Sequence, residues 1–257
     1  MYVTFDDIRQ VSVVAKNEMK KFIRGKRLLI YVVIAALFFA VTVIVPYLLL
    51  EPGEDFKVAV LGFSIASVSM LAAIAAILFA SGVIASEFEE RTALILFTRP
   101  IKKTTIFLGK IIGCLLFEII VLAGVYLILI LMTFFVVDGE VPVMGLFTSL
   151  GFAIMYLMAA SSVAILLSSV LKKASTSAVL SFFLLFMIIG IVTGLIQLFT
   201  EIEPWFMFDY AAELMMTSVP DIGVTSTMSN LESILVSSLW IGVSLVLGWI
   251  AFIRREF

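Results

Sequence analysis

Three glutamates followed by a short apolar run form the segment with the clearest potential for binding chemistry. Glu87, Glu89 and Glu90 end one long apolar segment, and residues 94–97 are all large and apolar. Carboxylates at a helix C-terminus are unfavourable to its dipole, so basic groups on a partner would stabilise them; a solvated helix end is the alternative. Burial of each large apolar side chain is worth about 1.5–3 kcal/mol, so residues 94–97 are expected to be covered. A groove on a soluble partner or the lipid head-group region would cover them equally well.

One carboxyl group, Glu118, lies well inside an apolar segment. An ionised carboxylate at the bilayer centre costs about 2.5–3.5 kcal/mol, so it must face other helices, be paired or be protonated. Two interpretations stay open: a proton- or cation-sensitive site on a transport path, or a structural hydrogen bond with partial snorkelling. Polar residues that could also line a path are Ser64, Ser67, Ser161, Ser162, Thr193 and Gln197. Such groups more often bond to backbone or pack between helices.

Several kinds of chemistry are excluded by the residues that the chain lacks. There is no histidine, which removes histidine-based catalysis, histidine metal ligands and a histidine pH switch. No G-x-x-x-x-G-K-[ST] loop is present, so any ATP used must be bound by another chain. Cys114 is the single cysteine and lies in an apolar helix, where we expect a packed, inert thiol.

The elements that must position these residues are six long apolar segments. They cover residues 28–50, 58–85, 106–137, 145–171, 174–199 and 234–253. Each has at least about 20 residues, enough to cross a hydrocarbon core of ~30 Å as a helix. With 63% hydrophobic residues and a mean hydropathy of +1.22, the chain is predicted to be an all-α integral membrane protein. Residues 1–27 precede the six-helix domain of residues 28–257.

The charges alternate along the connections between these segments. Of the 17 Lys and Arg residues, all but Lys57 fall on the side that holds both termini and the connection 86–105. The opposite side carries most of the acidic residues, many of them in the outer loop 200–233. By the positive-inside rule both termini are cytoplasmic.

Residues 1–27 predict a basic amphipathic helix at the cytoplasmic interface. Its apolar positions include Val11, Met19 and Phe22, and its basic positions include Lys16, Lys20 and Arg24. We expect the apolar face to lie toward the acyl chains and the charges toward anionic head groups. The helix serves either as a topology anchor alone or also as a contact for a cytoplasmic partner.

The second apolar segment has a stripe of small residues that predicts a central position in the bundle. Small side chains let neighbouring helices approach closely. The stripe consists of Gly62, Ala66, Ser69, Ala73, Ala76 and Ala80.

The outer loop contains aromatic and acidic residues between positions 203 and 214. With proline at its first turn, this stretch predicts a short helix at the outer surface or partly re-entrant. It is either an aromatic membrane anchor or an outer gate. The gate residues would be Trp205, Phe206, Asp209 and Tyr210.

The order of several short motifs resembles ABC-2 type permeases, the membrane subunits of one class of ATP-binding-cassette exporters. The matching positions are Glu87, Thr92, Pro100-Ile101, Gly109-Lys110, the serine-rich stretch 161–177 and the terminal residues 252–257. Arg91 stands where that family often has glycine. The resemblance implies a homodimer or paralogous heterodimer of permeases with two ATP-binding subunits, and a short coupling helix near residues 92–97. The coupling surface it implies comprises Glu87, Glu89, Glu90, Arg91, Thr92, Leu94, Ile95, Phe97, Arg99 and Pro100.

We therefore expect a permease that forms the translocation path and is not itself an enzyme. ATP and Mg²⁺ would be bound only by the partner subunit, and no nucleic acid is involved. The family implies export across the plasma membrane of a prokaryote. A secondary transporter or channel, a membrane-embedded enzyme and a non-transporting anchor subunit are the alternatives, and each has weaker support in the sequence.

Overall fold

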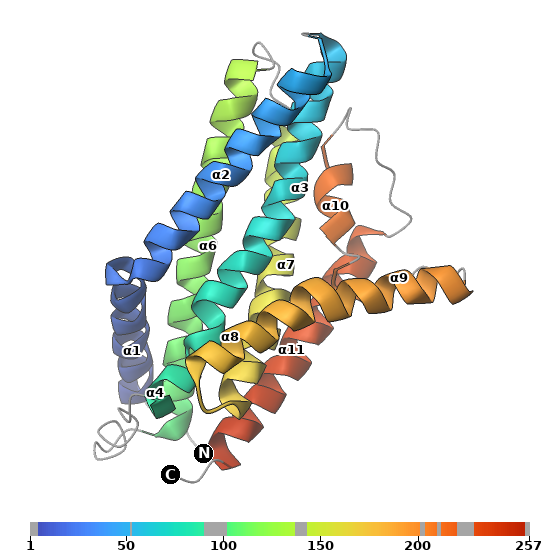
Figure 1. The fold of residues 1–257 in the computed structure, drawn as a ribbon. Helices are drawn as coiled ribbons and strands as arrows, with labels where there is room; N and C mark the ends of the chain where they lie inside the picture. The colour runs from blue at the N-terminus through green and yellow to red at the C-terminus, as the bar shows by residue number, and fades with distance from the viewer. Residues whose placement is uncertain are drawn as a thin grey trace.

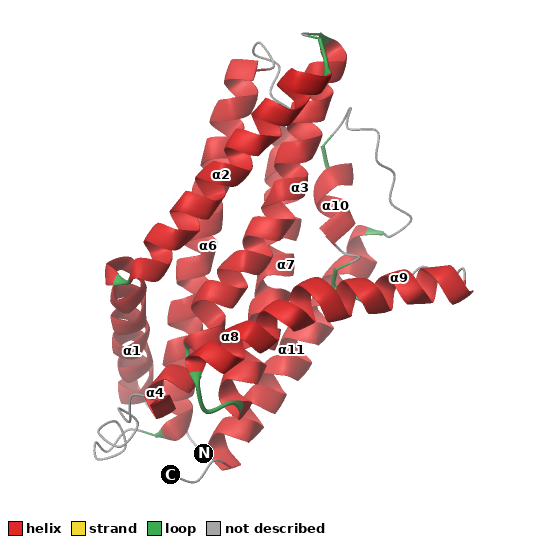
Figure 2. Ribbon diagram, in the orientation of Figure 1, coloured by secondary structure: helices red, strands yellow, loops and turns green. Residues whose placement is uncertain are grey.

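The computed structural model describes residues 5–51, 53–89, 102–136, 143–200, 204–209, 212–219 and 229–254. Every regular element among them is a helix (Figure 2). Six helical segments are long and apolar enough to cross a membrane. Over these residues the prediction of an all-α protein with six membrane-spanning helices is confirmed.

The six spans follow one another along the chain, and all but the fifth pack along one another as a bundle (Figure 1). The first three are α2 (Lys26–Leu49), α3 (Glu54–Phe79) continued by the 3₁₀ turn η1 (Ala80–Gly82) and α4 (Ala85–Glu89), and α6 (Lys103–Val136). The last three are α7 (Val143–Val170), α8 (Ala174–Phe182) continued by the π-helical η2 (Phe183–Ile188) and α9 (Ile189–Thr200), and α11 (Asn230–Arg254). Among the described residues, two further helices lie outside the spans, α1 (Phe5–Arg24) and α10 (Glu213–Thr217).

The second span lies at the centre of the bundle, as its small residues predict. In its most apolar stretch 78% of the residues are buried, compared with 22% in α2. Ala73, Ala76 and Ala80 are almost inaccessible to solvent, and α3 packs against α2, α6 and α7. Small side chains permit this close approach on several sides at once.

Helix α1 packs along the first half of α6, which differs from its expected placement against the acyl chains. Ala15 and Phe22 are buried in the protein, while Val11 and Met19 are half-buried. The reason is a glycine: a Cβ on Gly113 would lie 2.6 Å from the carbonyl oxygen of Ala15. Because Gly113 has no side chain, the backbone of α1 can approach α6 closely. Ala15 and Phe22 on the apolar face of α1 are then covered by protein.

The fifth span leaves the bundle. It begins beside α7 and η1, and α9 extends away from the other helices (Figure 1). Only 17% of its most apolar stretch is buried, so most of this span faces outward.

The helix predicted within residues 203–214 is not formed in its first part. Residues 204–209 make turns, and the short helix α10 begins at Glu213. The Phe206 carbonyl accepts a hydrogen bond from Trp240 Nε1 at 2.9 Å, and Phe208 packs edge-on against the Trp240 ring. These contacts with α11 replace those that a regular helix would make.

Candidate functional site

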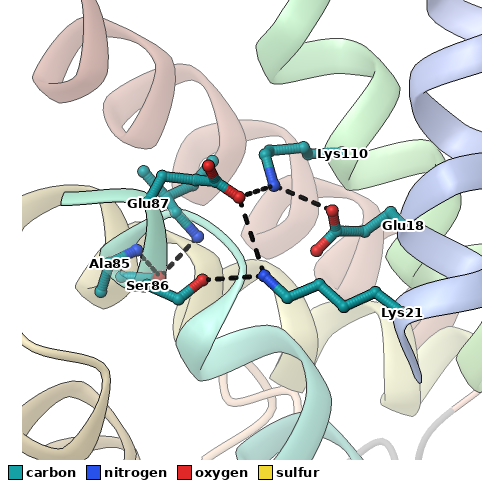
Figure 3. A network of polar contacts seen from close by, with 8 residues as sticks. Glu18, Lys21, Ala85, Ser86, Glu87 and Lys110 are labelled. Carbon is teal, nitrogen blue, oxygen red and sulfur yellow. Dashed lines mark hydrogen bonds and ion pairs between the residues drawn. The ribbon is translucent and has the colours of Figure 1, made fainter. Parts of the chain in front are cut away.

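The best-defined polar site lies around α4, where the second span leaves the membrane bundle (Figure 3). We call Glu18, Lys21, Ser86, Glu87 and Lys110 the α4 polar network. These residues come from α1, α4 and α6, so segments distant in sequence meet here.

Lys110 is the central residue of the network. Its Nζ lies 2.8 Å from Oε2 of Glu18 and 2.7 Å from Oε1 of Glu87. The Lys110 and Glu18 side chains are 5% and 7% exposed, and Glu87 is 17% exposed. Charges this well buried are tolerated only when paired and hydrogen-bonded. Lys110 therefore fixes α4 and α1 to α6 by the same ammonium group.

Lys21 adds a second, more exposed cation to the same carboxylate. Its Nζ donates to Ser86 Oγ at 3.3 Å and lies 3.7 Å from Glu87 Oε1. With a side chain 44% exposed, this pair is screened by solvent and is worth less than the Lys110 pairs. The two lysines balance the two glutamates, and the network is formally neutral.

The start of α4 is capped by α7. Ser168 Oγ accepts hydrogen bonds from the backbone N–H groups of Ile84 and Ala85, at 3.0 and 2.9 Å. The first N–H groups of a helix have no partner within the helix, so a serine oxygen stabilises them. Here that oxygen belongs to another span, and the cap therefore ties α4 to α7.

The end of α4 is tied to the fifth span. Glu89 Oε2 accepts a hydrogen bond from the backbone N–H of Ala174, the first residue of α8, at 2.9 Å. A carboxylate at a helix N-terminus is also favoured by the helix dipole. One short helix thus contacts α1, α6, α7 and α8 through identified polar groups.

The start of α2 is held against η1 by a further basic residue. Arg27 Nη1 donates to the Leu78 carbonyl at 3.1 Å. Gly82 leaves room for this guanidinium, since a Cβ there would lie 2.7 Å from Arg27 Nη1. The second span is therefore anchored on both sides of η1.

The structure places only part of the predicted coupling surface. Glu87 and Glu89 have the intramolecular partners described above. Glu90, Arg91, Thr92, Leu94, Ile95, Phe97, Arg99 and Pro100, with the short helix expected at 92–97, lie outside the described residues. A contact between this surface and an ATP-binding subunit stays a prediction.

The predicted residues of the N-terminal helix separate into two faces. Phe22 is buried and its ring lies 5.2 Å from that of Phe117 and 5.5 Å from that of Phe79. Lys16, Lys20 and Arg24 are exposed. The basic face of α1 is therefore exposed, whereas Ala15 and Phe22 on its apolar face are buried in the protein.

The intramembrane residue Glu118 is fully buried between α6 and α7. Ser161 Oγ donates to Glu118 Oε2 at 2.6 Å, and Cys114 Sγ lies 3.6 Å from Oε1. This geometry matches the structural hydrogen bond to a neighbouring helix. It also gives the buried Cys114 thiol a polar contact beyond simple packing.

Apart from Ser161, the predicted path residues form no hydrogen bond with Glu118 in the described part of the structure. Ser64 Oγ donates to Thr42 Oγ1 at 3.4 Å, and Ser67 Oγ to the Phe63 carbonyl at 2.8 Å. The Thr193 hydroxyl is buried without a hydrogen-bond partner among the described groups. The Gln197 side chain lies outside the described part of the structure.

The outer segment is docked through Asp209 and its neighbours. The Tyr156 hydroxyl donates to the Asp209 carboxylate, and burial raises the pKa of Asp209 despite this bond. Trp205 and Phe206 are largely exposed, and Tyr210 lies outside the described residues. Of the predicted gate residues, Asp209 and the Phe206 backbone contact the bundle.

Three central residues of the site, Glu18, Lys110 and Ser168, were not among the predicted site residues, although Lys110 and Ser168 lie in motifs that resemble the family. Lys110 lies one turn inside the predicted third span, and a lysine there needs an acidic partner. Glu18 is the acidic residue among the lysines of the N-terminal segment. The charges of Lys110 and Glu18 could therefore have indicated an ion pair, whereas nothing in the sequence distinguishes Ser168 from the other serines of its span.

The polar groups of this region join helices of the bundle to one another. Among the described residues, no group of three His, Cys, Asp or Glu side chains could hold a metal ion. The buried charges connect α1, α4 and α6.

Comparison with known proteins agrees with these features. Residues 12–257 match the family described as ABC-2 family transporter protein, and no curated protein matches the chain. The match spans α1 from its first turns, the α4 polar network and all six membrane spans. This chain therefore belongs to the ABC-2 family of transporters and is a transporter membrane subunit.

Proposed function

We propose that this chain is the permease subunit in which α4 transmits movement from a separate ATP-binding subunit to the membrane helices. The observation that carries the proposal is the double ion pair of Lys110 with Glu18 and Glu87. It joins the helix at the predicted contact surface, α4, to both α1 and α6.

The position of α4 in the chain favours this role. Helix α4 lies at the start of the predicted coupling segment 86–105, and its first residue is separated by only a few residues from the central span α3. A partner that displaces the coupling segment would push on α4. Because Ser168, Lys110 and Glu89 tie α4 to α7, α6 and α8, the displacement would be shared among these spans.

The charge distribution supports an orientation with α1 and α4 in the cytoplasm. Basic residues dominate the side of α1, α4 and the end of α11, which lie at one end of the bundle (Figure 1). The positive-inside rule assigns that end to the cytoplasm. We infer a prokaryotic plasma membrane, export, two permease copies as a homodimer or a paralogous heterodimer, and two ATP-binding subunits, and these inferences rest on the family.

Photo-crosslinking tests the contact with the partner. A photo-reactive residue replaces Leu94 in the predicted coupling segment, and a matched control replaces Leu131, which is exposed far along α6. After irradiation in native membranes, position 94 should crosslink to an ATP-binding subunit and position 131 should not. Crosslinks from position 94 to lipid alone would overturn the proposal.

ATPase measurements test the transmission step. In the reconstituted complex, Lys110→Met should uncouple ATP hydrolysis from transport, because α4 is no longer held to α1 and α6. Lys172→Met changes an exposed lysine in the turn before α8 and should leave both activities unchanged. If Lys110→Met keeps ATPase activity and transport in their normal ratio, the network does not transmit movement.

A further inference from the structure

An apolar groove runs between α6 and α11 near the end of the bundle that holds α4. Its volume is about 290 Å³, and only apolar atoms line it, close to the lower end of the ~300–1,000 Å³ typical of ligand pockets. Phe107 and Ile111 form the α6 side, and Val246 and Trp249 the α11 side. Both helices are membrane spans, so the groove opens toward hydrocarbon.

We propose that this groove binds one acyl chain of an anionic glycerophospholipid. Although Thr104 and Trp249 are among its lining residues, no polar atom is exposed in the groove. It therefore suits an apolar ligand, and an acyl chain is the apolar ligand that a bilayer always supplies. The lipid belongs to the leaflet on the α4 side, which is cytoplasmic in the orientation proposed above.

Basic residues at the ends of the two groove helices, on the α4 side of the bundle, favour an anionic head group. Lys103 directly precedes the groove residue Thr104, and the exposed Arg254 ends α11 five residues after Trp249. Five residues of helix rise about 7.5 Å, roughly the distance from upper acyl chain to head group. Trp249 adds an indole ring of the kind enriched at the membrane interface.

The floor of the groove connects to α4 through aromatic rings. Phe107 stacks on Phe252 with ring centroids 5.4 Å apart, and Phe252 meets Phe88 of α4 edge-on at 6.3 Å. An acyl chain packed on Phe107 would therefore support the position of α4. This regulatory part of the inference rests on the proposed function, whereas the binding site itself does not.

Tryptophan fluorescence tests the binding. The full-length W205F/W240F variant keeps Trp249 as its single tryptophan, and is placed in nanodiscs with small fractions of brominated phosphatidylglycerol or brominated phosphatidylcholine. A reference variant carries its single tryptophan at exposed position 243 instead of 249. Trp249 should be quenched more strongly than the reference, with a preference for phosphatidylglycerol of about fivefold for each basic residue near the surface.

Groove-filling variants give a second, independent measurement. Val246→Phe narrows the groove, while Val243→Phe changes a similarly exposed valine outside it. Native mass spectrometry of the detergent-purified chain should find phospholipid retained by wild type and Val243→Phe but lost from Val246→Phe.

Three outcomes would overturn the lipid site: quenching equal to that of the reference, lipid retention unaffected by Val246→Phe, or crosslinks showing that a second copy covers the groove. Because none of these readouts needs an ATP-binding subunit, their result is separate from that of the proposed function. If lipid binds and Val246→Phe nevertheless leaves ATPase activity unchanged in the complex, the binding site stands and the regulatory part is wrong.

Discussion

Lys110 on α6 and Glu87 on α4 are joined by an ion pair of 2.7 Å, although they lie at opposite ends of the connection between two spans. The pair therefore holds α4, at the start of the predicted coupling segment, to α6 at the end of that segment. It is largely buried and shares its lysine with Glu18 of α1. One ammonium group therefore links α1, α4 and α6.

Removal of Lys110 should destabilise the protein strongly. Lys110→Met leaves Glu18 and Glu87 buried without their shared cation, and loss of one partner of a buried pair costs about 3–5 kcal/mol. Denaturant unfolding in micelles measures the loss. Lys172→Met should stay within about 0.5 kcal/mol of wild type, and Glu18→Gln combined with Lys110→Met should recover part of the stability. An unchanged midpoint for Lys110→Met would show that the pair contributes no stability.

A methyl group on Gly113 should separate α1 from α6. The new Cβ would lie 2.6 Å from the Ala15 carbonyl oxygen and 2.9 Å from its Cα, and backbone atoms cannot move aside cheaply. Gly124→Ala is the matched control on the same helix, because nothing lies within 4 Å of its Cβ position. Limited proteolysis should release α1 faster in Gly113→Ala than in wild type or Gly124→Ala. Equal rates for the two variants would contradict the close packing.

Loss of the Ser168 hydroxyl should weaken the start of α4. Ser168→Ala removes the acceptor of two backbone N–H groups, and loss of such a cap costs about 0.5–2 kcal/mol. Ser162→Ala is a suitable control, since that buried hydroxyl donates to a carbonyl of its own helix. Hydrogen exchange at Ile84 and Ala85 should accelerate only in Ser168→Ala. Acceleration to the same extent in both variants would argue against the cap.

Replacement of Glu118 by glutamine should leave transport-linked ATPase activity nearly intact. The amide oxygen can still accept the hydrogen bond from Ser161, which is the structural role that the geometry indicates. Glu118→Leu should be less stable, since it leaves the buried Ser161 hydroxyl without this partner. A changed pH dependence of transport in Glu118→Gln would instead favour the proton-sensitive site.

The docked outer segment should become more stable as the pH falls. Burial raises the pKa of Asp209, so the folded state binds the proton more tightly than the unfolded state, whose pKa is about 3.9. The ionised carboxylate therefore opposes docking above the raised pKa, and this cost disappears as the pH falls toward the unfolded value. The melting temperatures of wild type and Asp209→Asn should be measured at several pH values. As the pH falls, the melting temperature of wild type should rise relative to that of Asp209→Asn. Tyr156→Phe should steepen the dependence, because its hydroxyl partly offsets the rise. A flat difference would contradict the shift.

Sequence reasoning located the spans well because their signal is local. Each observed span begins no more than four residues before the predicted segment, and the central place of α3 followed from its small residues. It failed where an outcome depends on contact between distant elements. The apolar face of α1 was assigned to lipid, but much of it packs against α6. Residues 204–209 form turns, and within them the Phe206 carbonyl accepts a hydrogen bond from Trp240 of α11.

The sequence by itself determined six spans, the side on which the basic residues gather, and the resemblance to the family that residues 12–257 match. These follow from lengths, hydropathy and charge counts, which need no knowledge of packing. Only the tertiary structure decided that Lys110 meets Glu18 and Glu87 and that Ser168 caps α4. Those contacts join residues 23 to 92 positions apart, and they depend on the rotation and depth of each helix. Helix rotation and depth are set by which side chains pack against each other. Here Gly113 permits the close contact of α1 with α6, and the small residues of α3 permit its central position.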